Sequence, residues 1–106
     1  MTAQFTISCG LDTNGHAVDA RQLVLDLAAE HFPQGHTIRE VVGRWQCADG
    51  AVVTEPTLEV VWFASDEQVQ KNEAHGRVAR FAAAYKAGAF QEAVLIARQD
   101  LDCVFV

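Results

Sequence analysis

Four residues have the types and the spacing to form a small-ligand site: Arg44, Trp45, Glu55 and Glu92. A guanidinium, two carboxylates and an indole can together hold a polar molecule through charge, hydrogen bonds and stacking. Arg44 and Glu55 flank Asp49-Gly50, a strong hairpin signal, so we expect them to face each other across paired strands. Glu92 begins a later strand, directly after a predicted helix stop. The alternative interpretation is structural: a cross-strand ion pair, with Trp45 filling the core.

The sequence lacks the motifs of several common chemistries. It contains no phosphate-binding G-x-x-x-x-G-K-[ST] or G-x-G-x-x-G loop and no G-x-S-x-G nucleophile elbow. The histidines and cysteines do not occur at the paired spacing of metal ligands. Adjacent carboxylates that could do acid–base work occur only at Asp66-Glu67. We therefore predict no catalytic residue, no metal site and no cofactor, and we favour a protein that is not an enzyme.

Length and charge narrow the class of protein. The chain has 106 residues, of which 50% are hydrophobic and 21% are charged, which is typical of a single ordered domain spanning the whole chain, residues 1–106. Its net charge of −6 does not provide the basic surface that binding to phosphates requires, so we predict no nucleic-acid partner. No apolar stretch is long enough to cross a bilayer, and the N-terminus has no signal-peptide pattern. We therefore expect a cytoplasmic protein with free thiols and no membrane partner.

The first half of the sequence predicts a strand, a helix and a long hairpin. Alternating apolar residues favour a strand in QFTISCGL. A helix follows, capped by Asp19 and ended before Pro33. The segments HTIREVVGRWQC and AVVTEPTLEVVWFA have the composition of paired strands. Their irregular alternation indicates a bulge near Gly43 or cover on both faces, and Pro56 marks a break or an edge.

The second half predicts one long helix and two short strands. The helix SDEQVQKNEAHGRVARFAAAYKAG begins at Ser65, whose side chain can form a capping box with Gln68, and ends near Gly88. The strands EAVLIAR and LDCVFV follow, joined near Gln99-Asp100. The order β-α-β-β-α-β-β predicts an α+β fold, namely a ferredoxin-like sandwich in which two helices cover one face of an antiparallel sheet of four or five strands.

Two helices cover only one face of such a sheet, although the strand that ends in VVWFA is apolar on both faces. Depending on register, the bare face exposes Val61 and Phe63, or Val60 and Trp62. An exposed apolar face predicts a partner, so we expect a homodimer or a complex with another protein. The function that follows is a small non-catalytic protein-interaction module. Two alternatives stay open: an acidic phage or mobile-element inhibitor that mimics nucleic acid or blocks host defence, and a small ligand-binding protein or cofactor-free enzyme of dimeric α+β type.

The sequence also resembles a known family. The elements that carry the resemblance are FPxGxT from Phe32, Gly43-x-Trp45, Asp49-Gly50, Glu55-Pro56, Tyr85-Lys86, QEAVL from Gln91 and the closing CVFV. In this order they resemble a family of small bacterial proteins described only as a domain of unknown function, from Phe32 to Val106 with a weaker match at ISCGLDTNG. Members of that family are often exported, whereas this chain shows no leader, which implies a cytoplasmic or phage-encoded relative. The resemblance implies no activity and no site residues.

Overall fold

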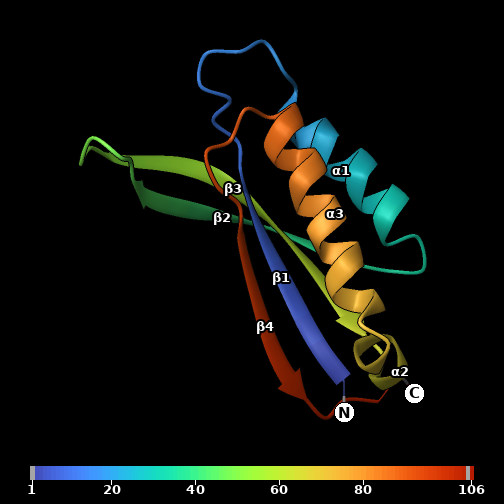
Figure 1. Cartoon of the computed structure of the whole chain (residues 1–106). Coiled ribbons are helices and arrows are strands. Elements are labelled where there is room, and N and C mark those ends of the chain that lie inside the picture. The colour runs from blue at the N-terminus through green and yellow to red at the C-terminus, as the bar shows by residue number, and fades with distance from the viewer. Residues whose placement is uncertain (1, 105) are drawn as a thin grey trace.

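The computed structural model describes residues 2–104 and residue 106, and Figure 1 shows the course of the chain. The elements follow in the order β1 (Thr2–Gly10), α1 (Ala20–His31), β2 (Thr37–Gln46), β3 (Val52–Ala64), α2 (Asp66–Gln70), α3 (Glu73–Gly88) and β4 (Leu95–Leu101). Within the described residues, four strands form one antiparallel sheet in the order β2-β3-β1-β4. The predicted α+β, ferredoxin-like fold is confirmed.

The helices begin at the capping residues that the sequence indicates. Asp19 Oδ1 accepts a hydrogen bond from the Gln22 N–H at 3.1 Å at the start of α1. The capping box of α2 is complete, because the side chains of Ser65 and Gln68 each accept a hydrogen bond from the backbone N–H of the other. The prediction of one long second helix is wrong: Asn72 takes a left-handed conformation, with φ of 59°, and this turn separates α2 from α3.

The core lies between the sheet and the helices α1 and α3, which cover the same face (Figure 1). Phe32, at the end of α1, places its ring centroid 4.9 Å from that of Trp62 and 5.4 Å from that of Phe81. Each large apolar side chain buried here stabilises the fold by roughly 1.5–3 kcal/mol. The Tyr85 hydroxyl donates a hydrogen bond to the Gly10 carbonyl, which ties the end of α3 to the end of β1. Burial raises the pKa of Tyr85 above its usual range.

The face of the sheet that carries no helix, called the open face below, shows one of the two residue pairs predicted for an interface. Val60 and Trp62 lie in the core under the helices, so their assignment to an exposed interface is wrong. Val61 and Phe63 lie on the open face, because side chains alternate along a strand. Phe63 is 37% exposed, whereas Val61 is only 6% exposed. That this face binds a second copy of the chain stays a prediction.

Much of the open face is polar. Thr6 and Ser8 of β1 lie on it, and Arg39 and Glu59 form an ion pair of 3.2 Å across β2 and β3. The open face is therefore mixed, because these polar groups lie beside apolar side chains such as Phe63 and Leu95. The expectation of an apolar second face was drawn from VVWFA at the end of one strand, and it holds for only part of the sheet.

Three strand predictions are changed by the observed pairing. β2 pairs with β3 without a bulge, from Thr37 opposite Val61 to Gln46 opposite Val52. Pro56 does not break β3 and lies just beyond the ladder with β1, although its carbonyl still accepts a hydrogen bond from the Leu11 N–H at 3.0 Å. In place of the two predicted C-terminal strands there is one, β4, which runs through Gln99-Asp100 and ends at Leu101; the prediction of a second strand in LDCVFV is wrong for residues 102–104. Phe105, which the sequence placed in the last strand, lies outside the described residues.

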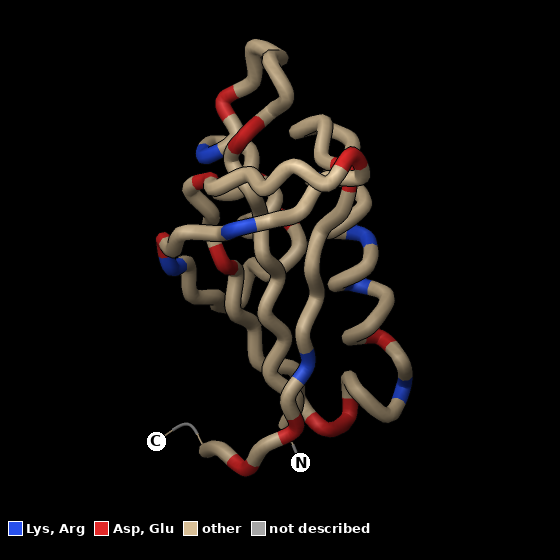
Figure 2. Tube along the Cα trace, turned by 90° about the vertical axis from the view of Figure 1, so that its left-hand side faces the viewer, with Lys and Arg blue, Asp and Glu red and all other residues tan. Residues whose placement is uncertain are grey.

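The charged residues are spread over the molecule. Figure 2 shows Lys and Arg scattered among Asp and Glu rather than gathered into one basic patch. None of the described helices combines the length and the apolar character needed to cross a membrane. In the same part of the chain, His, Cys, Asp and Glu do not gather in groups of three that could hold a metal ion.

Candidate functional site

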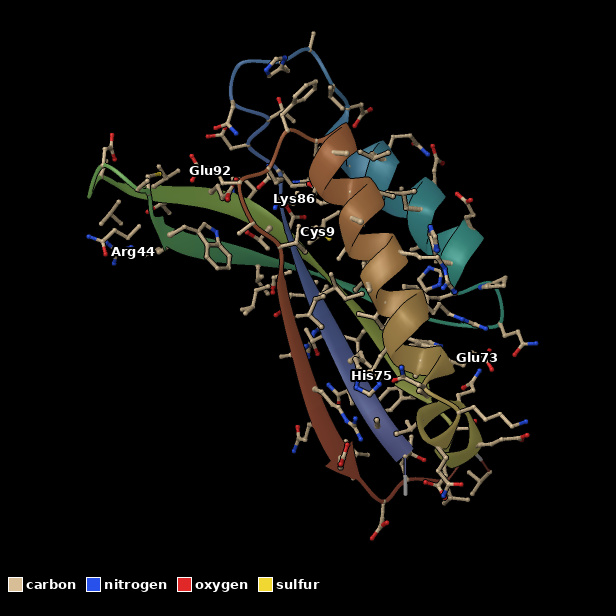
Figure 3. The ribbon with its side chains drawn as sticks, in the orientation of Figure 1. Cys9, Arg44, Glu73, His75, Lys86 and Glu92 are labelled. Atoms are coloured by element: carbon tan, nitrogen blue, oxygen red, sulfur yellow. The ribbon has the colours of Figure 1, made fainter. Side chains whose placement is uncertain are left out.

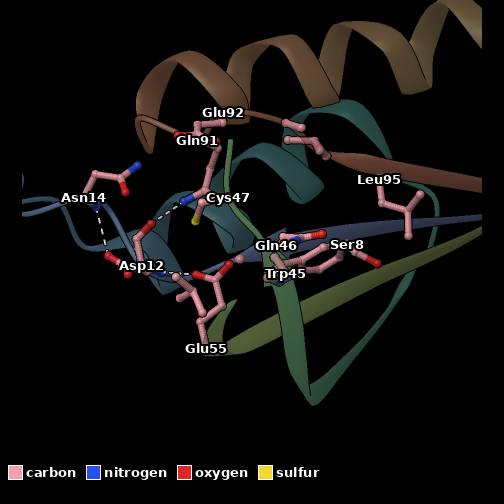
Figure 4. Close-up of a pocket in the computed structure, with 14 residues that line it drawn as sticks. Ser8, Asp12, Asn14, Trp45, Gln46, Cys47, Glu55, Gln91, Glu92 and Leu95 are labelled. Atoms are coloured by element: carbon pink, nitrogen blue, oxygen red, sulfur yellow. Dashed lines mark hydrogen bonds between the residues drawn. The ribbon is translucent and has the colours of Figure 1, made fainter. Parts of the chain in front are cut away.

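A cavity of about 350 Å³ opens at the end of the sheet where β1 stops (Figure 4). Ser8, Trp45, Glu55 and Leu95 line it, and all four belong to the open-face side of their strands. The rest of the lining comes from the loop after β1, the β2–β3 hairpin and the segment before β4. Small-molecule sites typically enclose about 300–1,000 Å³, so this cavity has the size of a site for one small ligand.

Glu55 lies across the end of β1 because position 10 is a glycine. A Cβ atom at Gly10 would lie 2.7 Å from Glu55 Cδ and 2.9 Å from Oε2, so any larger residue would displace the carboxylate. The side chain is largely buried, at 9% exposure, and Oε2 accepts a hydrogen bond from the Asp12 N–H at 2.8 Å. The fold therefore places a carboxylate in a partly desolvated position in the cavity wall.

Trp45 forms an aromatic wall of the same cavity. Its indole lies over Gly43, where a Cβ atom would come within 2.5 Å of Nε1 and 3.0 Å of Cε2. The indole Nε1 is buried and has no hydrogen-bond partner among the described residues. The structural interpretation of the sequence expected Trp45 to fill the core, and this is wrong for the core under the helices. Trp45 packs over the open face beside the cavity.

Two loops that are far apart in the sequence meet at the rim. The Gln91 side chain donates to the Asp12 carbonyl, and Asn14 Nδ2 donates to the Phe90 carbonyl at 2.6 Å. The rings of His16 and Phe90 are stacked, with centroids 3.6 Å apart and planes inclined by 7°. Asn14 and Phe90 both have a left-handed backbone, with φ of 55°. These contacts, called the rim clasp below, fix two of the segments that line the cavity.

The described lining of the cavity carries negative charge. Its described lining includes the carboxylates of Asp12, Glu55 and Glu92 but no Lys or Arg. Cys47, on the same wall, responds to this charge: its pKa is raised, first by burial and then by Glu92, Asp49, Asp12 and Glu55. A cavity of this kind favours a positively charged ligand over an anion.

Three of the four predicted site residues meet at the cavity, namely Trp45, Glu55 and Glu92. Arg44 does not. It lies opposite Thr54, while Glu55 lies opposite Gly43, so the predicted Arg44–Glu55 pair is wrong. Figure 3 shows Arg44 on the outer side of the hairpin, away from Glu92. The ligand-binding role of the other three residues stays a prediction.

Sequence reasoning missed Asp12, Cys47 and Gln91. Asp12 lies in a local turn, in which its Oδ1 accepts a hydrogen bond from the Asn14 N–H at 2.9 Å. Its place in the cavity depends on a contact with Gln91, which is 79 positions away. No local pattern encodes a contact over that separation.

The chain is similar to known proteins in sequence and in fold. The family described as "Protein of unknown function (DUF3574)" matches residues 11–105, which confirms the resemblance drawn from the sequence. No curated protein matches the chain. Among solved structures, the chain is similar to a phage SAM lyase in complex with S-methyl-5′-thioadenosine, with a TM-score of 0.71 and 18% identity over 93% of this chain and 81% of that one. It is also similar to phage SAM lyase in the apo state, with a TM-score of 0.70 and 20% identity over 92% of this chain and 78% of that one.

These structures correct the expectation of a non-catalytic protein-interaction module. That expectation was argued from a small α+β fold with one bare sheet face, and the same fold is found in a phage enzyme. The architecture therefore gives no support to a non-catalytic role. Since identities of 18% and 20% establish the fold alone, the chemistry of this chain has to be argued from its own cavity.

Proposed function

We propose that this chain, which belongs to the family described as "Protein of unknown function (DUF3574)", is a small enzyme that binds a sulfonium compound of the S-adenosylmethionine kind and cleaves a carbon–sulfur bond in it. One observation carries the proposal: carboxylates and an aromatic wall line a cavity whose described residues include no Lys or Arg, in a fold shared with phage SAM lyase. The chain's cysteines are free thiols, which suits a cytoplasmic enzyme, and we include that location in the proposal.

The charge of the cavity supports a sulfonium ligand. A sulfonium is a permanent cation that has no N–H or O–H to donate, so a protein recognises its charge through nearby negative groups or an aromatic face. Asp12, Glu55 and Glu92 supply such groups from three different segments. Glu55 is held in place by the Asp12 N–H, whereas Glu92 is exposed and makes no hydrogen bond or ion pair with another described residue. Glu92 is therefore the carboxylate that can adjust to a ligand.

The aromatic wall supports a nucleoside as the rest of the ligand. Stacking of a base on an aromatic side chain contributes roughly 1–3 kcal/mol and requires a flat apolar surface. Trp45 offers that surface, and Val53 and Leu95 add aliphatic contacts nearby. The polar side chains of Ser8 and Gln46 also line the cavity and can bond to ring nitrogens or ribose hydroxyls.

The proposed reaction neutralises the ligand. When the carbon–sulfur bond breaks, its electron pair goes to sulfur, which leaves as a neutral thioether. The carbon either accepts an electron pair from a carboxylate within the same substrate, or the neighbouring carbon loses a proton to a base and a double bond forms. Glu92 is the candidate base in the second route. In both routes the cation disappears, so the cavity carboxylates favour substrate over product and assist release of the thioether.

The test uses the purified chain with S-adenosylmethionine, and release of S-methyl-5′-thioadenosine is followed by liquid chromatography. We expect the sulfonium compound to bind more tightly than the thioether, because only the former is charged. Glu55→Gln and Glu92→Gln should each weaken binding of the sulfonium compound roughly tenfold and leave binding of the thioether unchanged. Glu30→Gln, on the exposed side of α1, is the matched control that removes a charge elsewhere.

Two results would contradict the proposal. The first is the absence of thioether release together with equal affinity for the two compounds. The second is that Glu30→Gln weakens binding as much as Glu92→Gln, since the effect would then come from net charge and not from the cavity. A fall in kcat for Glu92→Gln would favour the route with proton loss, and a change in KM alone would favour the internal carboxylate.

A further inference from the structure

A second cavity lies at the opposite end of the sheet and shares no lining residue with the first. Its volume is about 430 Å³. It lies where β2 begins and β3 ends, and it is closed by the loop after α1 and by the helices α2 and α3. The lining residues used below are His36, Thr37, Trp62, Phe63, Gln68 and Arg77.

The charge of this cavity is opposite to that of the first. No Asp or Glu belongs to its described lining, although the chain as a whole carries a net charge of −6. Arg77 supplies a full positive charge and lies with its guanidinium carbon 5.2 Å from the Trp62 ring centroid. Its Nη2 donates to Glu73 Oε1 at 2.8 Å, outside the cavity lining. A guanidinium has five N–H donors, so this one bond leaves donors for a ligand.

Other lining groups add donors near an apolar floor. Gln68 Oε1 is occupied by the Ser65 N–H at 2.9 Å, and its Nε2 has no hydrogen-bond partner among the described residues. Thr37 contributes a hydroxyl. His36 Nδ1 lies 3.0 Å from the Phe32 carbonyl, which can only accept, so the hydrogen on this nitrogen is used within the protein and holds the ring in place.

The floor of the cavity is hydrophobic and partly open. Val61, Trp62 and Phe63 line it at the end of β3, where the pairing with β2 stops: Trp62 points toward the helices, and Phe63, which is 37% exposed, points to the open face. A ligand that matches the helix side of this cavity needs a negative group for Arg77 and an apolar group for Trp62. A planar carboxylate is the anion that a guanidinium binds with two parallel hydrogen bonds.

We propose that this second cavity binds a small organic carboxylate with an aromatic or apolar body, the carboxylate on Arg77 and the body against the edge of Trp62. The inference does not depend on the proposed enzymatic function, since it uses different residues at the other end of the molecule. It accounts for a guanidinium that lies over an aromatic ring in a cavity whose described lining contains no Asp or Glu.

Fluorescence of Trp62 gives a direct test. The chain has two tryptophans, so in a Trp45→Phe background the emission comes from Trp62 alone. We use phenylacetate as the probe and phenylacetamide as its neutral analogue of nearly the same shape. Phenylacetate should give a saturable change in emission, and the amide should bind about tenfold more weakly, because a charged hydrogen bond is exchanged for a neutral one.

Three variants in the same background make the test specific. Arg77→Gln should weaken phenylacetate binding about tenfold, whereas Arg80→Gln, an exposed position on the same helix, should leave it unchanged. Glu73→Gln should tighten binding, because it removes the carboxylate that now engages Arg77. A gain of affinity cannot arise from loss of folding. Equal binding of the amide, equal effects of Arg77→Gln and Arg80→Gln, or weaker binding by Glu73→Gln would each overturn the proposal.

Discussion

Replacing Gly10 by Ala tests whether this glycine is required so that Glu55 can lie across the end of β1. The backbone of Gly10 is an ordinary strand without positive φ, so alanine itself is allowed there. The cost comes only from the new methyl group, which would lie 2.7 Å from Glu55 Cδ and 2.9 Å from Oε2. Glu55 has little room to retreat, because it is 9% exposed and bonded to the Asp12 N–H at 2.8 Å.

The expected loss of stability follows from three terms. Overpacking of a close-packed site costs about 1–3 kcal/mol. If Glu55 moves instead, the charge-assisted bond to Asp12 is lost, which costs about 1.5–3 kcal/mol. Alanine also lowers the conformational entropy of the unfolded chain relative to glycine, which raises the free energy of unfolding by about 0.4–1 kcal/mol. We therefore expect Gly10→Ala to lower the free energy of unfolding by about 2 kcal/mol and the urea midpoint by about 1 M.

The assay is urea unfolding followed by tryptophan fluorescence, with Glu55→Ala as a second background. Truncation of Glu55 removes the atoms that the methyl group would meet, so Gly10→Ala should then be neutral or slightly stabilising. The coupling between the two changes should be about 1–2 kcal/mol. Gly76→Ala in α3 is the control, since the nearest atom is the mobile end of Arg80 at 3.2 Å and helix propensity favours alanine by about 0.5–1 kcal/mol. If Gly10→Ala costs the same with and without Glu55, the reasoning is refuted.

Two further predictions concern the core and the rim. Burial raises the pKa of Cys9 from 9.0 to about 12, so its stabilising contribution is complete below pH 9 and is lost as the pH rises from 9 towards 12. The free energy of unfolding should therefore fall less steeply across this window in Cys9→Ala than in the parent chain. Tyr85 adds to the decline above pH 10 in both chains. Equal slopes in the two chains would contradict the assignment of the decline to Cys9. Phe90→Ala removes the stack on His16 and should lower stability by about 1 kcal/mol and weaken sulfonium binding; an unchanged thermal midpoint and affinity would show that the rim clasp has no role.

The order of elements could be predicted from the sequence because local signals determine it. Asp19 and Ser65 cap helices in the expected way, and their hydrogen bonds are present. The break at Asn72 could not be predicted in the same way, since asparagine adopts both helical and left-handed conformations and only tertiary context selects one.

The register of the central hairpin shows why the site was only partly predicted. A two-residue turn at Asp49-Gly50 would place Arg44 opposite Glu55. The observed loop is longer, because Gln46 pairs with Val52 and the Cys47 N–H bonds to the Ala51 carbonyl at 2.8 Å. This difference shifts the register by one residue and places the two side chains on opposite faces.

The cavity also explains why the open face has less need of a partner than the sequence suggested. At this end of the sheet, Gly10 and Gly43 leave room for Glu55 and Trp45 to pack over the strands. The chain thus covers part of its second face with its own side chains, and one of them is a carboxylate with limited access to water. Burial of a charge is costly unless it is paired, and the single bond from Asp12 offsets only part of that cost. A cation in the cavity would offset more of it, so the same arrangement that positions Glu55 also provides a reason for a cationic ligand to bind and to stabilise the fold.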